Sequence, residues 1–490
     1  MADASPLLNS NEWGSIDEVM DGPLQDIVPD NTWFAVILLW LTFPLGLLIG
    51  IIGGVNAACM RLLAWTGCLS AYKSVINGRP WYFSFPWWSY MFSLIVALAK
   101  SKGCRLRLFM WENSVFGGKE HWWHGEGVWC KSWALCDQIM RSVQERKMAF
   151  GCQMAPVPDV YPPSILIFLP CGDNDSEWWA IRNMLHTFFL DMGLDQYTAR
   201  VADLDAKLQE NWPDIQLVDM DDPAVVQRMV SKCMFYVLFG KWITDDEAKV
   251  LTGWRSLAPI FVFPRIGQRM IFNLGVGKVK KLRRDTVQIV ENYGLQDLFM
   301  QMNASLPPKY RRDPVVKLCD EVMYVIGFAG IGGTSACSET VSAFLQLKIP
   351  KECAKETINF SNYESAAAMV ACYREDPVAY IKESGRVNPP VTSATSVLKE
   401  DTTIEMVGEE VTLPPGMLRQ YTLSMANRDP EVFEEPDLFN PQRGDLNKAL
   451  TWNGAFGMSN EADYLRICPG RNLSVSVAKA VIDRALASFE

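Results

Sequence analysis

The sequence feature that most limits what this chain can fold into is the short loop around Cys468. Cys468 stands two residues after Arg466 and directly before Pro469 and Gly470, and an amphipathic helical pattern follows at 473–487. A turn at Pro469-Gly470 leaves backbone N–H groups free near the sulfur, and the next helix directs its positive end toward it. Both effects favour the thiolate. The pattern indicates a metal ligand, as haem iron requires; a buried, inert cysteine is the alternative.

Further patterns precede this loop in a fixed order. Glu383 and Arg386 lie three residues apart in a helical stretch that prolines end, so they can form an ion pair. Arg-Asp-Pro occupies 428–430, and Phe-x-Pro-x-Arg occupies 439–443. Each pattern alone is weak evidence, because short charged spacings are common. Together, in this order and before the cysteine loop, they are specific.

With these patterns the chain resembles the cytochrome P-450 superfamily, whose cysteine loop reads Phe-x-x-Gly-x-Arg-x-Cys-x-Gly. Residues 466–470 match the second half, but extra residues separate Phe456-Gly457 from it. A lengthened loop after Trp-x-Asn-Gly is similar to the plant-type allene oxide synthase and hydroperoxide lyase branch. The resemblance covers about 81–490. It implies a mainly α-helical fold with small β-sheets.

The resemblance also implies the cofactor. It implies haem b, with Cys468 as the axial iron ligand and Arg466 and Gly470 in the cofactor-binding loop. Trp178 and Arg182 are four residues apart on one helix face, and the resemblance implies that they bind a haem propionate. Taken alone, the same spacing is that of an ordinary amphipathic helix in which tryptophan packs and arginine is solvated.

The same resemblance implies a structural role for the Glu-x-x-Arg pattern. In the superfamily, the Glu-x-x-Arg pair and a later arginine form a buried triad that supports the cysteine loop. The corresponding residues here are Glu383, Arg386 and Arg443.

A glycine-rich run, 327–334, interrupts the long helix predicted between Pro314 and Ile349. Glycine inside a helix costs about 1 kcal/mol relative to alanine, so a plain scaffold helix is an unusual place for several. A helix that bends and lets a flat cofactor or a substrate approach its backbone would use them. The run therefore indicates the reaction side of the fold.

The same run departs from the oxygen-activating members, which carry an acid and an alcohol for proton delivery. Gly332 and Gly333 stand at those two places, and Thr334 is one place late. The hydroperoxide branch has Phe-Asn-x-x-Gly-Gly, which fits except that Ala329 replaces the asparagine that orients the peroxide. The branch also has an aromatic residue over the haem, where this chain has Gln153. The candidate catalytic positions are Ala329, Gly332, Gly333, Thr334 and Gln153.

The N-terminal third predicts a membrane anchor. Residues 1–32 contain seven acidic side chains and no Lys or Arg, which indicates a polar tail rather than a targeting peptide. The run 33–60 has no charged residue and exceeds the roughly 20 apolar residues that span a bilayer, so we predict a transmembrane helix. A buried core helix is the alternative. Basic residues follow the run within the linker 61–80, and the positive-inside rule then places the N-terminus outside and the body, 81–490, on the cytoplasmic or stromal side.

Two stretches after the linker are less specific. The aromatic-rich apolar run 81–99 predicts a helix and is a weaker candidate for a second crossing, and the alternating residues 104–109 predict a strand. Residues 278–284 hold five basic side chains in seven positions. They suit a docking patch for an electron donor or an anionic membrane, although such runs are usually solvated helix faces.

Composition excludes some functions. A net charge of −10 argues against a nucleic-acid partner, which requires a basic surface. Thirteen cysteines without a Cys-x-x-Cys pair indicate neither a disulfide framework nor a zinc site.

Three functions follow as hypotheses. The first is a membrane-anchored haem-thiolate enzyme, a dehydratase or lyase that rearranges or cleaves fatty-acid hydroperoxides, as in oxylipin formation. Its partners are the lipid bilayer, through 33–60 in the endoplasmic reticulum or a plastid, and a fatty-acid-derived substrate. The second is an oxygen-activating monooxygenase. The third is a P-450-like subunit or scaffold of a larger membrane complex, without catalysis but with a membrane-protein partner. The chain ends at Glu490, before the terminal hairpin that usually lines the pocket in the superfamily.

Overall fold

The computed structural model describes most of the chain after residue 176 and selected segments before it. The predicted anchor 33–60, the linker 61–80, the apolar run 81–99 and Gln153 lie outside the described residues. In the part that is described, no helix combines the length and apolar character that a membrane crossing requires. The described residues are 12–20, 104–116, 120–124, 127–141, 176–190, 194–255, 265–350, 353–397, 401–406, 409–413, 418–458 and 463–489.

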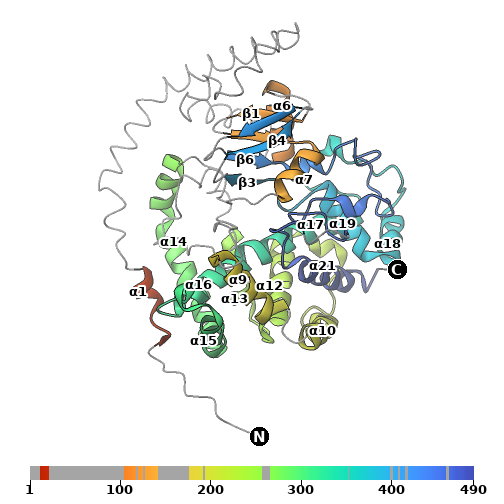
Figure 1. The fold of residues 1–490 in the computed structure, drawn as a ribbon. Helices are drawn as coiled ribbons and strands as arrows, with labels where there is room; N and C mark the ends of the chain where they lie inside the picture. Colours follow the sequence, from red (N-terminus) through yellow and green to blue (C-terminus); the bar gives the residue numbers. More distant parts are fainter. Residues whose placement is uncertain are drawn as a thin grey trace. The chain divides into compact units, whose positions relative to one another are not determined.

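The chain divides into two compact units. One consists of residues 1–29, 150–346 and 468–490, and is called here the helical unit. The other consists of residues 30–149 and 347–467, and is called the sheet unit because the described strands belong to it. The mainly α-helical architecture with small sheets that the sequence predicts is present in these described segments (Figure 1).

The helical unit contains α-helices joined by short 3₁₀ and π turns. Its elements are α1 (Ile16–Met20), α9 (Glu177–Leu185), η3 (His186–Leu190), α10 (Leu194–Ala202), α11 (Leu204–Asn211), η4 (Leu217–Asp221), α12 (Pro223–Phe239), α13 (Asp245–Gly253), α14 (Arg265–Asn292), α15 (Gln296–Ser305), η6 (Pro308–Tyr310), α16 (Val316–Val325), η7 (Ile326–Ile331), α17 (Gly332–Leu345) and α21 (Arg471–Leu486).

Helices α12, α17 and α21 form the centre of this unit. Asp222 caps the start of α12, followed by Pro223 at the first helical position, and Gly240 ends the helix in the left-handed conformation. Buried side chains occupy most of α12, so it packs on several sides rather than on one stripe. It contacts α17 and α21, which also contact each other. Figure 1 shows these three helices close together.

The helix predicted between Pro314 and Ile349 is present as the continuous run α16, η7 and α17. The glycine-rich stretch coincides with η7, a π-helical turn in which each N–H reaches one residue further back than in an α-helix. The prediction of a helix that is distorted at its glycines is therefore confirmed. A π turn of this kind displaces backbone locally and is frequent at functional sites.

The N-terminal residues 12–20 pack on the helical unit. Helix α1 contacts α14 and α16, and Met20 is fully buried. This part of the predicted acidic tail is therefore packed against helices. The basic run 278–284 belongs to α14 and is largely engaged inside the unit: Arg283 is buried against Asp320, and Arg284 and Lys280 contact the N-terminal segment.

The sheet unit combines two small sheets with short helices. Its four-stranded sheet has the order β1-β2-β6-β3, in which β2 and β6 run parallel and the other pairs antiparallel. Strands β4 and β5 form an antiparallel pair. The elements are α6 (Arg105–Phe116), β1 (His121–His124), β2 (Gly127–Cys130), α7 (Trp133–Arg141), η8 (Lys355–Thr357), α18 (Ala366–Glu375), α19 (Pro377–Val387), β3 (Ala394–Val397), β4 (Thr402–Met406), β5 (Glu409–Leu413), β6 (Leu418–Tyr421), α20 (Leu423–Ala426) and η9 (Leu446–Lys448).

One prediction from alternation is wrong. Residues 104–109 alternate in polarity and were expected to form a strand, but Arg105–Phe116 is the helix α6. Six alternating residues are too few to distinguish the two periods. The continuation to Phe116 contains methionine and glutamate, which favour helix.

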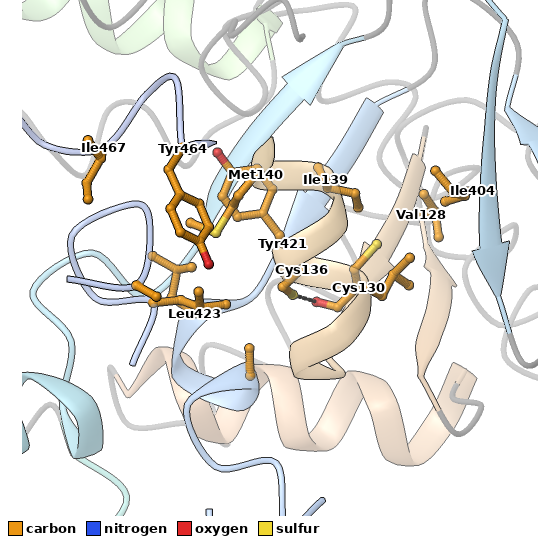
Figure 2. Close-up of a cluster of buried hydrophobic side chains, with 14 of the residues drawn as sticks. Val128, Cys130, Cys136, Ile139, Met140, Ile404, Tyr421, Leu423, Tyr464 and Ile467 are labelled. Carbon is orange, nitrogen blue, oxygen red and sulfur yellow. Dashed lines mark hydrogen bonds between the residues drawn. The ribbon is translucent and has the colours of Figure 1, made fainter. Parts of the chain in front are cut away.

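The core of the sheet unit joins the four-stranded sheet to α7 and to the loop that precedes Cys468. Val128 and Cys130 of β2 and Tyr421 of β6 pack with the buried face of α7, as Figure 2 shows. Tyr464 and Ile467, from the loop, belong to the same cluster. Packing of this cluster therefore fixes the end of the loop at the residue before Cys468.

The triad predicted from the sequence is assembled in the sheet unit. Arg386 donates from Nε to Glu383 Oε2 at 2.7 Å and from Nη2 to Oε1 at 2.8 Å. Arg443 Nε and the Asn440 backbone N–H also donate to Glu383 Oε1, at 3.3 and 2.9 Å. Both residues of the primary pair are fully buried. The carboxylate is thus saturated with donors, as a buried charge requires.

Removing one member of the triad should destabilise the protein strongly. We expect Arg386→Leu to lower the free energy of unfolding by about 3–5 kcal/mol, because it removes the two shortest charged bonds to Glu383 and leaves this buried charge only partly compensated. Urea unfolding of the purified chain measures this. The matched control is Glu356→Gln, which breaks the exposed bidentate pair with Arg107 in the same unit and should cost about 0–1 kcal/mol. Equal losses in the two variants would contradict a special role for the buried triad.

Candidate cofactor site

Cys468 lies at the start of α21 in the helical unit. The helix begins at Arg471, with Gly470 at the N-cap position and no side chain capping it. The Cys468 carbonyl accepts from Arg471 Nη1 at 3.0 Å, and Ser474 N donates to the Gly470 carbonyl at 2.8 Å. A Cβ added at Gly470 would meet no atom within 4 Å. The turn therefore holds the cysteine near the positive end of a sixteen-residue helix.

Cys468 differs from most of the other described cysteines in its exposure. Seven of the nine are buried, and burial raises the pKa of both Cys130 and Cys337 to about 12, which keeps those thiols protonated. Cys468 and Cys372 are partly exposed. Cys372 lies 3.3 Å from the Tyr363 hydroxyl, and burial raises its thiol pKa. Among the described cysteines, Cys468 is the one that lies both in the Arg-x-Cys-x-Gly motif and just before the start of α21.

The loop before the cysteine is packed tightly in the sheet unit. Asn453 adopts the left-handed region, with φ of 66°, and its Nδ2 donates to the Arg466 carbonyl at 2.8 Å. A Cβ at Gly454 would lie 2.7 Å from Tyr464 Cγ, so this close approach requires glycine. Arg466 is buried, with 5% of its surface exposed. The predicted cofactor-binding arginine is thus held by the Trp-Asn-Gly end of the loop.

The extra residues of the loop are attached to α7. Arg141 donates from Nη1 to Asp463 and from Nη2 to the Tyr464 hydroxyl, each at 2.8 Å. Arg141 also bonds Asp137 on its own helix at 2.8 Å, and Asp137 accepts from the Tyr464 hydroxyl. The lengthening that distinguishes this loop from the usual form therefore provides an additional anchor for it.

Trp178 and Arg182 share one face of α9, as their spacing predicts. The Arg182 guanidinium carbon lies 5.2 Å from the Trp178 ring centroid, and both side chains are buried. Ser176 caps the helix by accepting from Trp179 N. The alternative of a packed tryptophan with a solvated arginine does not hold, because Arg182 is only 8% exposed. A buried guanidinium beside an indole N–H is a suitable pair of donors for a carboxylate.

The glycines of the η7–α17 junction have different surroundings. A Cβ at Gly327 would lie 2.5 Å from Trp254 Cδ1, so this glycine is required by packing. A Cβ at Gly330 would meet only the flexible Met234 methyl at 3.2 Å. At Gly333 it would meet no atom within 4 Å. Close helix packing explains the first glycine, whereas the absence of a side chain at Gly333 leaves space beside the helix.

The remaining catalytic candidates on this helix are Ala329, Gly332 and Thr334. Ala329 is exposed, and Gly332 is buried. The Thr334 hydroxyl is buried and donates to Ser474 Oγ of α21 at 2.9 Å. Thr334 therefore connects two helices of the unit. The fifth candidate, Gln153, lies outside the described residues.

Arg419, on β6, was not identified from the sequence. Its side chain is fully buried, and none of its three guanidinium nitrogens has a hydrogen-bond partner. Burial lowers its pKa to about 10, and the neighbours that oppose this shift are Cys130 and Tyr421 rather than a carboxylate. A buried, unpaired cation is costly, so this position requires an anion. A sequence signal existed: alternation along β6 places Arg419 on the same face as the core residue Tyr421.

Comparisons with known proteins agree with this architecture. Residues 378–490 match the family model described as Cytochrome P450. The chain is 34% identical over 110 residues to the divinyl ether synthase CYP74 of Allium sativum, covering 21% of this chain and 23% of the relative. It is 27% identical over 151 residues to the probable cytochrome P450 28d1 of Drosophila melanogaster, covering 30% and 28%. The matched regions therefore span about a quarter of the length of these curated relatives.

Solved structures show the same fold over a larger part of the chain. The ligand-free cytochrome P450 TbtJ1 aligns with a TM-score of 0.55 at 14% identity, covering 78% of this chain and 90% of that one. CYP109E1 from Bacillus megaterium aligns with a TM-score of 0.52 at 14% identity, covering 79% and 94%. The described part of the chain therefore has the fold of solved cytochrome P450 structures, and its C-terminal region, 378–490, matches the Cytochrome P450 family. Over 110 residues the chain also resembles the Allium relative.

The cofactor of this superfamily is haem with an axial cysteine thiolate, and the residues present fit it. Cys468 is the one cysteine in the matched sequence 378–490. Haem also carries two propionates, which are anions. Arg182 in the helical unit and Arg466 in the sheet unit are buried cations, and Arg419 is a buried guanidinium without an anion in the structure. Cys468 would hold the iron, and a buried guanidinium is suited to bind a propionate.

The glycines at the helix junction should respond differently to a methyl group. We expect Gly327→Ala to lower the free energy of unfolding by about 1–3 kcal/mol, because its Cβ would overlap Trp254. Gly333→Ala should leave it unchanged or raise it by up to about 1 kcal/mol, since alanine favours helix and the position is open. Denaturant unfolding of the haem-free chain distinguishes them. A larger loss for Gly333→Ala would show that the space beside Gly333 is occupied by protein.

Substitution of Arg419 should have opposite effects on the haem-free and haem-bound protein. We expect Arg419→Met to raise the unfolding midpoint of the haem-free chain, because it removes an unpaired buried charge. It should also speed haem transfer to an excess of apoglobin by about tenfold or more, through loss of a charged hydrogen bond. Arg107→Gln, in an exposed pair of the same unit, is the control and should change neither quantity. Unaltered haem transfer in Arg419→Met would exclude it as a propionate ligand.

Proposed function

We propose that this protein is a haem-thiolate enzyme that rearranges or cleaves fatty-acid hydroperoxides without an electron donor. The observation that carries the proposal is the chemistry of the helix at η7 and the start of α17. Between 326 and 338 the sequence has no acidic or basic residue, and Gly332 and Gly333 stand where an acid and an alcohol are expected. The nearest hydroxyl, that of Thr334, is used in the bond to Ser474.

The next acid along the helix does not replace the missing one. Glu339 accepts from both terminal nitrogens of Arg255, with Oε2 at 2.8 Å from Nη2, so it is held in an ion pair. Activation of molecular oxygen requires protons at the reacting centre, and this stretch of helix has no acidic or basic side chain to deliver them. A hydroperoxide substrate brings its own O–O bond and removes that requirement.

Haem with a thiolate ligand would supply the cleavage of that bond, since electron donation from sulfur favours splitting O–O. The chain's own residues would position the substrate. The open position at Gly333 leaves room for a chain of methylene groups beside the helix, and the exposed Ala329 offers no donor to orient the peroxide. We therefore expect a slow enzyme rather than an inactive one.

The relatives support this reaction class without determining it. One matching protein is named a divinyl ether synthase, and it resembles the present chain at 34% identity over 110 residues. Others are named monooxygenases or a sterol desaturase. The choice among these chemistries therefore rests on the glycines and the engaged Thr334 rather than on similarity.

The proposal includes a membrane location. The uncharged run 33–60 would insert into a bilayer of the endoplasmic reticulum or a plastid, where fatty-acid hydroperoxides partition. The substrate would then reach the haem domain from the lipid phase. No nucleic-acid partner is expected from a chain with a net charge of −10.

Turnover of a hydroperoxide tests the proposal. Purified haem-loaded protein should consume linoleic-acid hydroperoxide, measured as loss of the conjugated-diene absorbance, without NADPH or reductase. Ala329→Asn should raise the rate by about tenfold or more, since the added amide can orient the peroxide and orientation lowers the activation barrier. Ala336→Asn, seven residues further along the same helical run, is the control and should leave the rate unchanged.

A different outcome would favour a second function. If both the wild-type protein and Ala329→Asn bind haem normally and consume no hydroperoxide, this catalysis is excluded. The exposed Ala329, which replaces an orienting amide, would then favour a P-450-like subunit or scaffold of a membrane complex. Co-purification of one stoichiometric membrane protein would be its positive test.

A further inference from the structure

The N-terminal residues 12–20 are bound to the helical unit by their backbone. Val315 N donates to the Glu12 carbonyl at 3.0 Å, and Val316 N donates to the Trp13 carbonyl at 2.9 Å. These two bonds satisfy donors at the start of α16 that have no partner within the helix. The segment therefore completes the first turn of α16, the helix that carries the glycine junction.

Side chains extend this attachment. Trp13 Nε1 donates to Glu291 Oε1 of α14 at 2.9 Å, and the Trp13 ring packs edge-on against Phe299 of α15 at 6.4 Å. Met20, at the end of α1, has no exposed surface. A buried methionine and a tryptophan with its indole N–H satisfied are features of a packed core. Figure 1 shows α1 beside α14 and α16.

Charge complementarity holds the remaining side of the segment. Arg284 of α14 pairs with Asp17, and Lys280 Nζ donates to the Met20 carbonyl at 3.1 Å. Two of the five basic residues in the run 278–284 are therefore engaged with the chain's own N-terminal segment. We call residues 12–20, with these contacts, the N-terminal strap.

These contacts constrain how the chain meets a membrane. Direct hydrogen bonds of about 3 Å cannot form across a hydrocarbon layer about 30 Å thick. A single crossing at 33–60, as the charge pattern predicts, would place the strap and the helical unit on opposite sides. The sequence between residue 20 and α6 contains two runs long enough to cross: 33–60, and the apolar residues 81–99.

We infer that the strap and the helical unit lie on the same side of the membrane, so that the chain between them crosses it twice, at 33–60 and 81–99. The inference rests on the membrane location proposed above. The basic residues act in opposite directions at the two runs. At 33–60 the three basic residues in 61–80 favour the opposite orientation, and at 81–99 the four basic residues in 100–107 favour the side of the helical unit. The hydrogen bonds of the strap decide the first run. The two crossings would place 61–80 on the far side of the membrane and bring the chain back to the side on which the strap lies.

Three epitope tags on the full chain test this topology. One precedes Met1, one follows Glu490, and one is inserted within 61–80. In sealed microsomes treated with protease, the two terminal tags should be digested together, and the inserted tag should be protected. Terminal tags on opposite sides would overturn the inference. Digestion of all three tags in the same protease-treated sealed microsomes, with release of the chain by alkaline carbonate, would instead contradict the membrane location and hence that part of the proposed function.

A second measurement tests the strap itself. Trp13→Ala should accelerate thermolysin cleavage of the N-terminal segment by about tenfold or more, since both the ring contact and the bond to Glu291 are lost. Asp17→Asn should accelerate it to a smaller extent. Glu18→Gln is the matched control, because Glu18 is exposed and adjacent, and it should change nothing. Equal cleavage rates in all three variants and the wild type would show that the segment is not docked in solution.

Discussion

The buried carboxylate of Glu383 is the interaction on which the sheet unit depends. It accepts from Arg386, Arg443 and the Asn440 backbone, so its charge is compensated where no water reaches it. Arg386 then uses its other nitrogens to bind the carbonyls of Asn427 and Pro436, at 2.7 and 2.8 Å. One ion pair thereby joins α19 to the irregular segment that leads into the cysteine loop. Irregular backbone needs such side-chain partners because no ladder or helix satisfies it.

The chemistry proposed for the molecule depends on a second constraint, in the helical unit. Gly327 is required because Trp254 occupies the space of a side chain, whereas Gly333 is open. Gly327 lies in the π turn and Gly333 lies just after it, where the backbone register of the helix has shifted. One glycine of the run can therefore serve packing, while another leaves space for the reaction. The Thr334 hydroxyl, bonded to Ser474, ties this junction to the helix that begins after Cys468. A helix arranged in this way can lie close to a flat group, yet between 326 and 338 it carries no acidic or basic side chain.

Sequence reasoning succeeded where spacing determines structure. Glu383 and Arg386 form the expected ion pair because three residues separate them on a helix, and Trp178 and Arg182 meet because four do. The distorted glycine helix could also be predicted, since consecutive glycines weaken a regular ladder. These features depend on residues close together in the sequence, or on a few motifs that follow one another in a fixed order.

The features that the sequence did not reveal are mostly contacts between distant parts of the chain, and one is a local pattern too short to assign. Arg419 lacks a local motif, and its significance depends on the absence of a carboxylate around it, which a sequence does not show. The strand expected at 104–109 is a helix because six alternating residues are compatible with both periods. The N-terminal strap is acidic and short, so composition indicates a tail, whereas Met20 is buried and Trp13 contacts residues almost 300 positions away.

The central claim is that Cys468 ligates haem through its thiolate. The most direct test is the absorption spectrum of the purified protein after reduction and addition of carbon monoxide, compared with Cys468→Ala and with Cys372→Ala, the other partly exposed cysteine described. The account predicts a thiolate-type Soret band in the wild type and in Cys372→Ala, and its loss in Cys468→Ala. A folded wild-type protein that takes up no added haemin, or a band that survives in Cys468→Ala, would contradict it.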